Sequence, residues 1–358
     1  MRVYCGISFH GFGHLAQAAP VIHELTQRIR IDSLTLQCCA PPGELQRWFS
    51  YPHHHENIET DVGIPMFDAL TANEEATYQQ YQIQLQERPQ RIKRLENLLR
   101  KHNPDLVLSN NSPLLSRAAA NLAIPCFHFC SLNWADIFWG YCQGKPNANE
   151  IYQSLCSDFN AADGFFRLPP YMPMPGLTNL IDVGPVCRTG QTRDLIRELR
   201  LEKPHHLVLI SMGGMPYPID FSNWPRFKNT TFLYGGVYSH ELPPNFLHSQ
   251  ELNIPHLDLM FNCDLVITKP GYGTFVEAAC SGTPILYLPR KDWPEEPWLI
   301  QWQQDKTYCQ EISAEQLRTG NLQEEVSQGC GQRRAPIVKP TGATDIVDHL
   351  LATLKPTQ

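Results

Sequence analysis

Two closely spaced glycines interrupt an apolar segment in the second half of the chain, where a strand is expected to give way to a helix. The turn reads Gly271-Tyr272-Gly273-Thr274 and opens the predicted helix. Free backbone N–H groups and the positive end of the helix then lie at the carboxyl edge of a parallel sheet, where a diphosphate binds well. Gly271 and Gly273 let the backbone approach that anion closely, and Thr274 either caps the helix or donates its hydroxyl to a phosphate oxygen.

Carboxylates follow this turn at two places. Glu277 either completes a capping box or accepts hydrogen bonds from a ribose diol, and the pattern alone leaves both interpretations open. The later run Arg290–Pro297 contains the pair Glu295 and Glu296. Exposed charge runs are usually solvated, so the pair is either surface charge or part of a ligand site.

The second candidate for chemistry is the segment His10-Gly-Phe-Gly-His14, directly after the first apolar strand. It lacks the third glycine of a dinucleotide-binding fingerprint, which argues against NAD. His14 at a strand-to-helix turn would face a cleft and titrate near neutrality, which suits a general base. The alternative is that His14 only caps the helix. His10 is expected to orient the loop or to share the chemistry.

Short apolar runs alternate with helical patterns through both halves of the chain and predict two parallel sheets covered by helices, an α/β fold with two doubly wound, Rossmann-like domains. Proline-rich Leu168–Val186 is the predicted linker. We expect a first domain over residues 1–170 and a second over residues 186–340, with a C-terminal helix over residues 343–355 returning to the first. Ser211-Met212-Gly213-Gly214 forms a tight turn after the first strand of the second half.

The composition is that of a globular protein. The 358 residues are 42% hydrophobic and 18% charged, with a formal net charge of -7, which argues against a nucleic-acid-binding surface. The 12 cysteines form no CxxC pair, and no transmembrane run or signal peptide is recognised. These features predict a cytoplasmic protein without a metal site, and the triple histidine at 53–55 is expected to be a solvated turn.

The segment from Lys269 to Glu277 resembles the donor-binding signature of GT-B glycosyltransferases, with Lys269, Gly271, Thr274 and Glu277 at matching positions. The resemblance implies that the turn residues Gly271–Thr274 contact the donor diphosphate and that Glu277 contacts the ribose. Plant-type members carry a histidine where Lys269 stands; a lysine still meets phosphate as a point charge. The further residues that the resemblance assigns are Gly13, Ser211, Gly213 and Gly214 to the diphosphate, and Glu295 and Glu296 to sugar hydroxyls.

His14 matches the position of the family's general base, which takes the proton from the acceptor. In plant-type members an aspartate at the end of a later strand steadies this base. The corresponding strand here reads Leu106-Val107-Leu108-Ser109-Asn110-Asn111, without a carboxylate. Either His14 works without such a partner, or the chemistry differs.

A resemblance over almost the whole chain is to the N-terminal, glycosyltransferase-like half of plant L-arabinokinases. It rests on HGFGH, on Ser131–Tyr141, on Arg167–Val186, on LPPNF and on KPGYGTFVEA. The kinase phosphate loop is absent, so kinase activity is not expected. Within this resemblance Asn133, Trp134 and Asp136 either line an acceptor cleft or belong to an aromatic cluster that packs the core.

These features together predict a hexosyltransferase-type enzyme that moves a sugar from a nucleotide-diphosphate donor to an unknown acceptor, without a cofactor. Two alternatives remain open: a catalytically silent nucleotide-sugar-binding sensor or scaffold, favoured by the missing carboxylate, and a nucleotide-sugar hydrolase or epimerase on the same fold.

Overall fold

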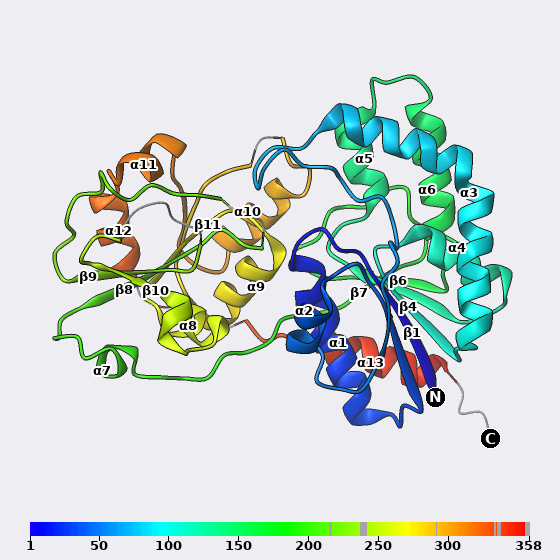
Figure 1. Ribbon diagram of the computed structural model, residues 1–358, viewed down its shortest axis with the longest axis horizontal. Helices are drawn as coiled ribbons and strands as arrows, with labels where there is room; N and C mark the ends of the chain where they lie inside the picture. Colours follow the sequence, from blue (N-terminus) through cyan, green and yellow to red (C-terminus); the bar gives the residue numbers. More distant parts are fainter. Residues whose placement is uncertain (215–216, 237–241, 291, 333, 335–337, 355–358) are drawn as a thin grey trace.

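The computed structural model describes residues 1–214, 217–236, 242–290, 292–332, 334 and 338–354. Lys291 of the charge run and Lys355 of the predicted C-terminal helix lie outside these residues. Figure 1 shows two lobes side by side, each built around its own sheet.

The first lobe contains a seven-stranded sheet in the order β3-β2-β1-β4-β5-β6-β7, in which every pairing is parallel. The order reverses between β1 and β4, and in doubly wound sheets the crevice at such a reversal is where ligands bind. Helices cover both faces of the sheet. The strands are β1 (Arg2–Ile7), β2 (Ser33–Gln37), β3 (His54–Glu56), β4 (Leu106–Asn110), β5 (Cys126–Cys130), β6 (Gly164–Arg167) and β7 (Leu180–Asp182). The helices are α1 (Gly13–Arg28), α2 (Pro42–Trp48), α3 (Glu74–His102), α4 (Pro113–Asn121), α5 (Trp134–Cys142) and α6 (Ala148–Phe159).

The second lobe repeats the plan with six parallel strands in the order β10-β9-β8-β11-β12-β13, and its order reverses between β8 and β11. The strands are β8 (His206–Ser211), β9 (Thr230–Tyr234), β10 (Phe246–His248), β11 (Leu265–Thr268), β12 (Ile285–Tyr287) and β13 (Cys309–Glu311). The helices are α7 (Leu195–Glu198), α8 (His256–Asn262), α9 (Tyr272–Ser281), α10 (Glu296–Gln304), α11 (Ala314–Thr319), α12 (Gln323–Cys330) and the 3₁₀ turn η1 (Ser249–Leu252).

The last helix, α13 (Gly342–Thr353), lies beside α1 on the first lobe. Arg28 Nη1 is 2.6 Å from Asp348 Oδ1, and the His349 ring packs edge-on against Phe127 and Phe166. The segment that leaves the first lobe and the segment that returns to it touch at Gly184 and Gly342. The contact is so close that a Cβ on Gly342 would lie 2.1 Å from the carbonyl oxygen of Gly184. Glycine at this position allows the two backbone passages to touch.

The GT-B arrangement of two Rossmann-like units predicted from the sequence is confirmed. Two local predictions are wrong. The predicted linker contains β7, which pairs with β6. The triple histidine is no turn, because two of its residues lie in the edge strand β3. The aromatic segment after β5 forms helix α5, and its fully buried Trp134 and Phe138 agree with the alternative in which this cluster packs the core. In the described part of the chain no helix is long and apolar enough to cross a membrane.

Candidate active site between the two lobes

The N-termini of α1 and α9 face each other where the carboxyl ends of the two sheets meet (Figure 1). A Cβ on Gly273 would lie 3.5 Å from the Cβ of Ala16. Among the described residues no side chain caps either helix, whose N-cap residues are Phe12 and Gly271. Uncapped first-turn amides and the helix dipoles place partial positive charge at this junction between the lobes, which suits an anion.

His14 lies in the first turn of α1 and is buried among polar groups. Its Nδ1 lies 2.6 Å from Oδ1 of Asn110, the last residue of β4. The orientation of the Asn110 amide is fixed, because its Nδ2 donates to the backbone carbonyl of Phe129 at 2.8 Å and to Gln17 Oε1 at 3.0 Å. Asn110 Oδ1 therefore accepts a hydrogen bond from the Nδ1–H of His14, and Nε2 of the neutral ring carries the free lone pair.

Burial lowers the pKa of His14 to about 4, although the hydrogen bond that His14 donates to Asn110 opposes this shift. A carboxylate at the position of Asn110 would stabilise the imidazolium, whereas the neutral amide orients the ring with little effect on its charge. His14 is thus neutral at physiological pH and can accept a proton at Nε2 without first losing one.

His10 lies at the contact between the lobes. Its ring stacks on Trp293 of the second lobe, with ring centroids 6.0 Å apart, and meets Trp134 edge-on at 5.5 Å. Burial and the nearby charges of His14, Lys269 and Arg290 lower its pKa to about 3. These contacts suit a residue that holds the loop after β1 in place.

Lys269 follows β11 and lies beside the glycine turn after β8. A Cβ on Gly213 would be 3.9 Å from the lysine Nζ, and Gly213 has a φ of +81°, which glycine adopts without strain. Within the described residues the ammonium of Lys269 makes no hydrogen bond or ion pair. Burial, together with the charge of Arg290, lowers its pKa to about 7.

Glu277 lies on α9 one turn inside the helix and does not cap it. Its carboxylate has no hydrogen-bond partner in the described chain, and burial raises its pKa to about 7, against the opposing charge of Arg188. The Arg188 guanidinium lies 4.0 Å above the Trp48 ring. Of the two interpretations left open for Glu277, the capping box is absent, and contact with a ribose stays a prediction.

The other residues predicted around the donor differ in their partners. The Thr274 hydroxyl neither caps α9 nor bonds to another described residue. Tyr272 Oη accepts from the backbone N–H of Val186 at 3.0 Å and is buried, which makes that side chain part of the lobe contact. Ser211 Oγ lies 3.3 Å from His256 Nε2. Gly214 packs against the Phe12 ring, and Gly13 opens α1 with open space beside it.

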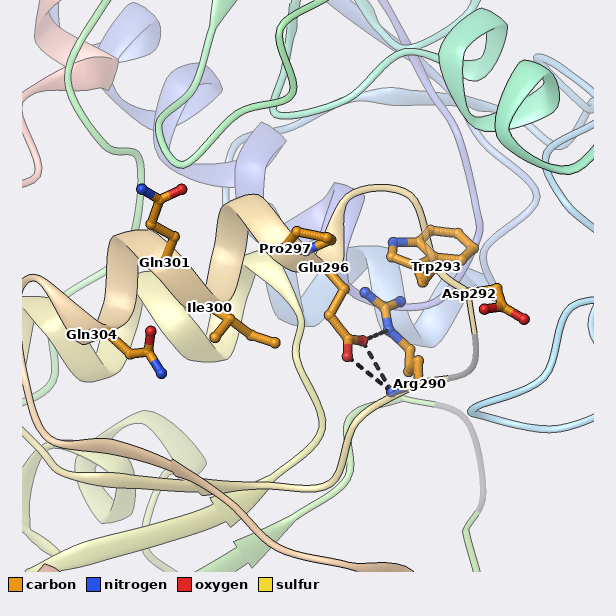
Figure 2. A pocket seen from close by; sticks show the side chains of 8 residues that line it. All are labelled: Arg290, Asp292, Trp293, Glu296, Pro297, Ile300, Gln301 and Gln304. Carbon is orange, nitrogen blue, oxygen red and sulfur yellow. Dashed lines mark hydrogen bonds and ion pairs between the residues drawn. The ribbon is translucent and has the colours of Figure 1, made fainter.

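Glu295 and Glu296 are not a solvated surface pair, because both are buried. Glu295 accepts hydrogen bonds from Ser131 Oγ at 2.7 Å and Trp293 Nε1 at 3.1 Å. Glu296 accepts from the backbone N–H of Arg290 at 3.0 Å and lies 3.4 Å from its Nε. Figure 2 shows the Arg290 guanidinium between Glu296 and the Trp293 ring, at the edge of a pocket of about 380 Å³ along α10.

The predicted acceptor residues separate into two groups. Asn133 is the N-cap of α5: its Oδ1 accepts from the Asp136 N–H at 2.8 Å, and its Nδ2 donates to the Asp136 carboxylate. Tyr152 Oη also donates a hydrogen bond to Asp136 Oδ1, at 3.1 Å. Trp134 packs between the rings of His10 and His14. Of the three, the structure brings only Trp134 next to the candidate base.

Sequence reasoning missed the groups that orient His14, namely Asn110, Gln17 and Ser131, and the Arg188–Trp48 pair near Glu277. The one available signal was the polar end of β4 in an otherwise apolar strand. It was interpreted as the loss of a carboxylate, whereas Asn110 supplies the hydrogen bond without the charge.

No known family profile matches the chain. It is 26% identical over 307 residues to the L-arabinokinase of Arabidopsis thaliana; the match covers 82% of this chain but only 28% of the length of that protein. Its fold is similar to that of the calicheamicin glycosyltransferase CalG4 (TM-score 0.66, 14% identity, 100% of this chain and 99% of that chain). It is also similar to the UDP-GlcNAc 2-epimerase of Neisseria meningitidis bound to UDP-GlcNAc (TM-score 0.54, 15% identity, 99% and 100%). The predicted resemblance to an L-arabinokinase is confirmed for part of that protein, and the structural neighbours establish the fold.

Proposed function

We propose that this protein transfers a sugar from a nucleotide-diphosphate donor to an acceptor hydroxyl, with His14 as the general base. The supporting observation is that two unlike groups lie at one junction between the lobes. His14, with a free Nε2, is in the first turn of α1, and Ala16 of the same helix lies against Gly273 at the uncapped N-terminus of α9. A nucleophile to be deprotonated and a diphosphate to be expelled require these two groups on opposite sides of a sugar.

His14 takes the acceptor proton at Nε2 as the bond to the sugar forms. Asn110 keeps the proton on Nδ1 throughout, so the ring approaches the acceptor in one tautomer and one orientation. Because burial lowers the pKa of His14 to about 4, the base stays unprotonated well below neutral pH. Trp134 and His10 pack beside it and hold this side of the cleft in shape.

The leaving diphosphate is received by the first-turn amides of α9, by the Gly213–Gly214 turn and by Lys269. These groups place positive charge where negative charge develops, and such stabilisation is usually a large contribution to catalysis. Glu277 accepts hydrogen bonds from the ribose, and it lacks a protein partner in the described chain that would compete. Glu295 and Glu296 offer their remaining lone pairs to sugar hydroxyls.

A second candidate is a catalytically silent nucleotide-sugar-binding protein. It is favoured by Asn110, because a neutral amide stabilises the imidazolium less than the aspartate of plant-type enzymes would. The two candidates share the donor site and differ only in turnover.

The test begins with thermal shift measurements on UDP, TDP, GDP and ADP, because a ligand that binds only the folded protein raises its melting temperature. Release of diphosphate from the matching sugar nucleotide is then followed with and without a panel of hydroxyl acceptors. Acceptor-dependent release supports transfer, and binding without release supports the silent protein. Release without acceptor, or a changed sugar epimer, would instead indicate a hydrolase or an epimerase, and a complete lack of nucleotide binding would overturn both candidates.

A further inference from the structure

Four hydrogen bonds in sequence connect His14 of the first lobe to Glu295 of the second. His14 Nδ1 donates to Asn110 Oδ1 at 2.6 Å, and Asn110 Nδ2 donates to Gln17 Oε1 at 3.0 Å. Gln17 Nε2 donates to Ser131 Oγ at 3.0 Å, and Ser131 Oγ donates to Glu295 Oε1 at 2.7 Å. All five side chains are buried, with exposures between 0% and 6%.

The direction of every bond is fixed from both ends of this chain of hydrogen bonds. A carboxylate only accepts, so the single hydroxyl proton of Ser131 points to Glu295 and its oxygen is left to accept from Gln17. Gln17 must then turn its oxygen to Asn110. The carbonyl of Phe129 independently requires Asn110 Nδ2, which leaves Asn110 Oδ1 for His14. Hydrogen-bond chains that point one way strengthen one another, above all in a buried setting.

We propose that Ser131 and Glu295 are positioning residues for the base, and that the carboxylate absent beside His14 acts instead from the far end of this chain. The inference rests on the proposed role of His14. Glu295 is the N-cap residue of α10 and is held by Trp293, whose ring stacks on His10. This series of hydrogen bonds is complete only while the two lobes touch at Ser131 and Glu295. The orientation of the base thus depends on the contact between the lobes as well as on its own helix.

The first experiment removes one link that touches no substrate. Ser131→Ala is expected to lower the turnover of UDP-glucose about tenfold, because small displacements of a catalytic group have large effects on rate. Its dissociation constant for UDP should stay within about twofold, since Ser131 lies away from the diphosphate-binding turn. Ser116→Ala is the matched control. Ser116 is an equally buried serine of the first lobe that bonds to the Pro113 and Asp158 carbonyls and to His128, and it takes no part in the four hydrogen bonds from His14 to Glu295.

A second readout needs neither donor nor acceptor. In ¹⁵N-histidine-labelled protein, the Nδ1–H proton of His14, assigned with His14→Ala, is expected to resonate far downfield. Its resonance should move upfield in Ser131→Ala and in the isosteric Glu295→Gln as the chain weakens, and stay in place in Ser116→Ala. If the Nδ1–H resonance of His14 is unchanged in both Ser131→Ala and Glu295→Gln, the inference is overturned. Glu295→Gln serves independently if Ser131→Ala does not fold.

A double-mutant cycle separates this inference from the proposed function. If Ser131 acts through the chain, Ser131→Ala should have no additional effect on turnover in an Asn110→Ala background. A full tenfold loss in that background would show that Ser131 acts by another route and would overturn the inference. If Asn110→Ala alone leaves turnover unchanged, the proposed base has failed instead, and the Nδ1–H resonance still decides whether the chain exists.

Discussion

The two sides of the cleft differ in how their polar groups are satisfied. On the first lobe His14, Asn110, Gln17 and Ser131 bond to one another. On the second lobe the side chains of Lys269, Thr274 and Glu277 lie at or near the start of α9 and have no hydrogen-bond partner among the described residues. The base side is therefore preorganised before any substrate arrives, whereas the donor side keeps unpaired groups that a ligand must satisfy. The difference implies that substitutions of His14 and its hydrogen-bond partners reduce rate, whereas substitutions of Lys269, Thr274 and Glu277 reduce affinity.

The largest expected effect follows loss of the base. His14→Ala is expected to reduce turnover by roughly 10²–10⁴-fold, the usual contribution of positioned proton transfer. His14→Asn is the matched variant, because its amide can still donate to Asn110 but it has no atom at the place of Nε2. Both should bind the nucleotide diphosphate like the wild type in calorimetry. Wild-type turnover in either variant would show that the preorganised side has no catalytic role.

Replacement of Lys269 comes next. Lys269→Met is expected to weaken nucleotide-diphosphate binding about 10- to 100-fold, since a hydrogen bond to a charged group contributes roughly 1.5–3 kcal/mol. The control is Lys228→Met, on the same lobe but away from the cleft. Calorimetry measures both affinities. Equal affinity in the two variants would contradict the interpretation that the ammonium is kept unpaired for a diphosphate.

Glu277 tests the same side through affinity and stability together. Glu277→Ala and Glu277→Gln should each weaken binding by about 1–3 kcal/mol through the lost ribose hydrogen bonds. The folded-state pKa of about 7 lies above the ordinary carboxyl value, so the unfolded chain binds fewer protons between these values. Stability thus falls as pH rises through that window.

Removal of this buried charge should consequently stabilise the empty protein at pH 8. The free energy of unfolding of Glu277→Gln is expected to rise by roughly 1–3 kcal/mol, because one unit of pKa shift corresponds to about 1.4 kcal/mol. Thermal unfolding measures it. A lowered melting temperature with unchanged affinity would instead give Glu277 a purely structural role.

The smallest expected effect is a dependence of donor binding on pH. Lys269, with a pKa of about 7, loses its charge above that pH, and Glu277 gains a proton below it. Nucleotide-diphosphate affinity should therefore be greatest near pH 7 and decrease by at most about tenfold per pH unit on either side. Lys269→Met should abolish the alkaline decrease and Glu277→Gln the acidic one, as followed by calorimetry. Affinity that is independent of pH between 6 and 8 would contradict both assignments.

The sequence predicted those parts of the site that depend on local order along the chain. A strand, a glycine turn and a helix are consecutive, so the turns at His14 and at Gly271–Thr274 could be placed from pattern alone. The partners of His14 could not, because Asn110 is 96 residues away and no pattern states which polar residue of a strand end points inward. Asn133 and Asp136 show a different limit: no pattern revealed that the Asn133 side chain caps α5 and bonds to Asp136, and their assignment to an acceptor stays a prediction.

The crossing of the chain at Gly184 and Gly342 makes the second lobe an insertion within the first. The two connections between the lobes lie side by side, so the lobes can rotate relative to each other about this one point without straining any other covalent connection.

The start of β1 and the end of α13 lie together on the first lobe (Figure 1). A reporter fused to either terminus would be attached to the lobe that contains His14. A second reporter in a surface loop of the other lobe would then report the relative position of the two lobes. Energy transfer between two such labels would measure any relative movement of the lobes without altering residues of the candidate site.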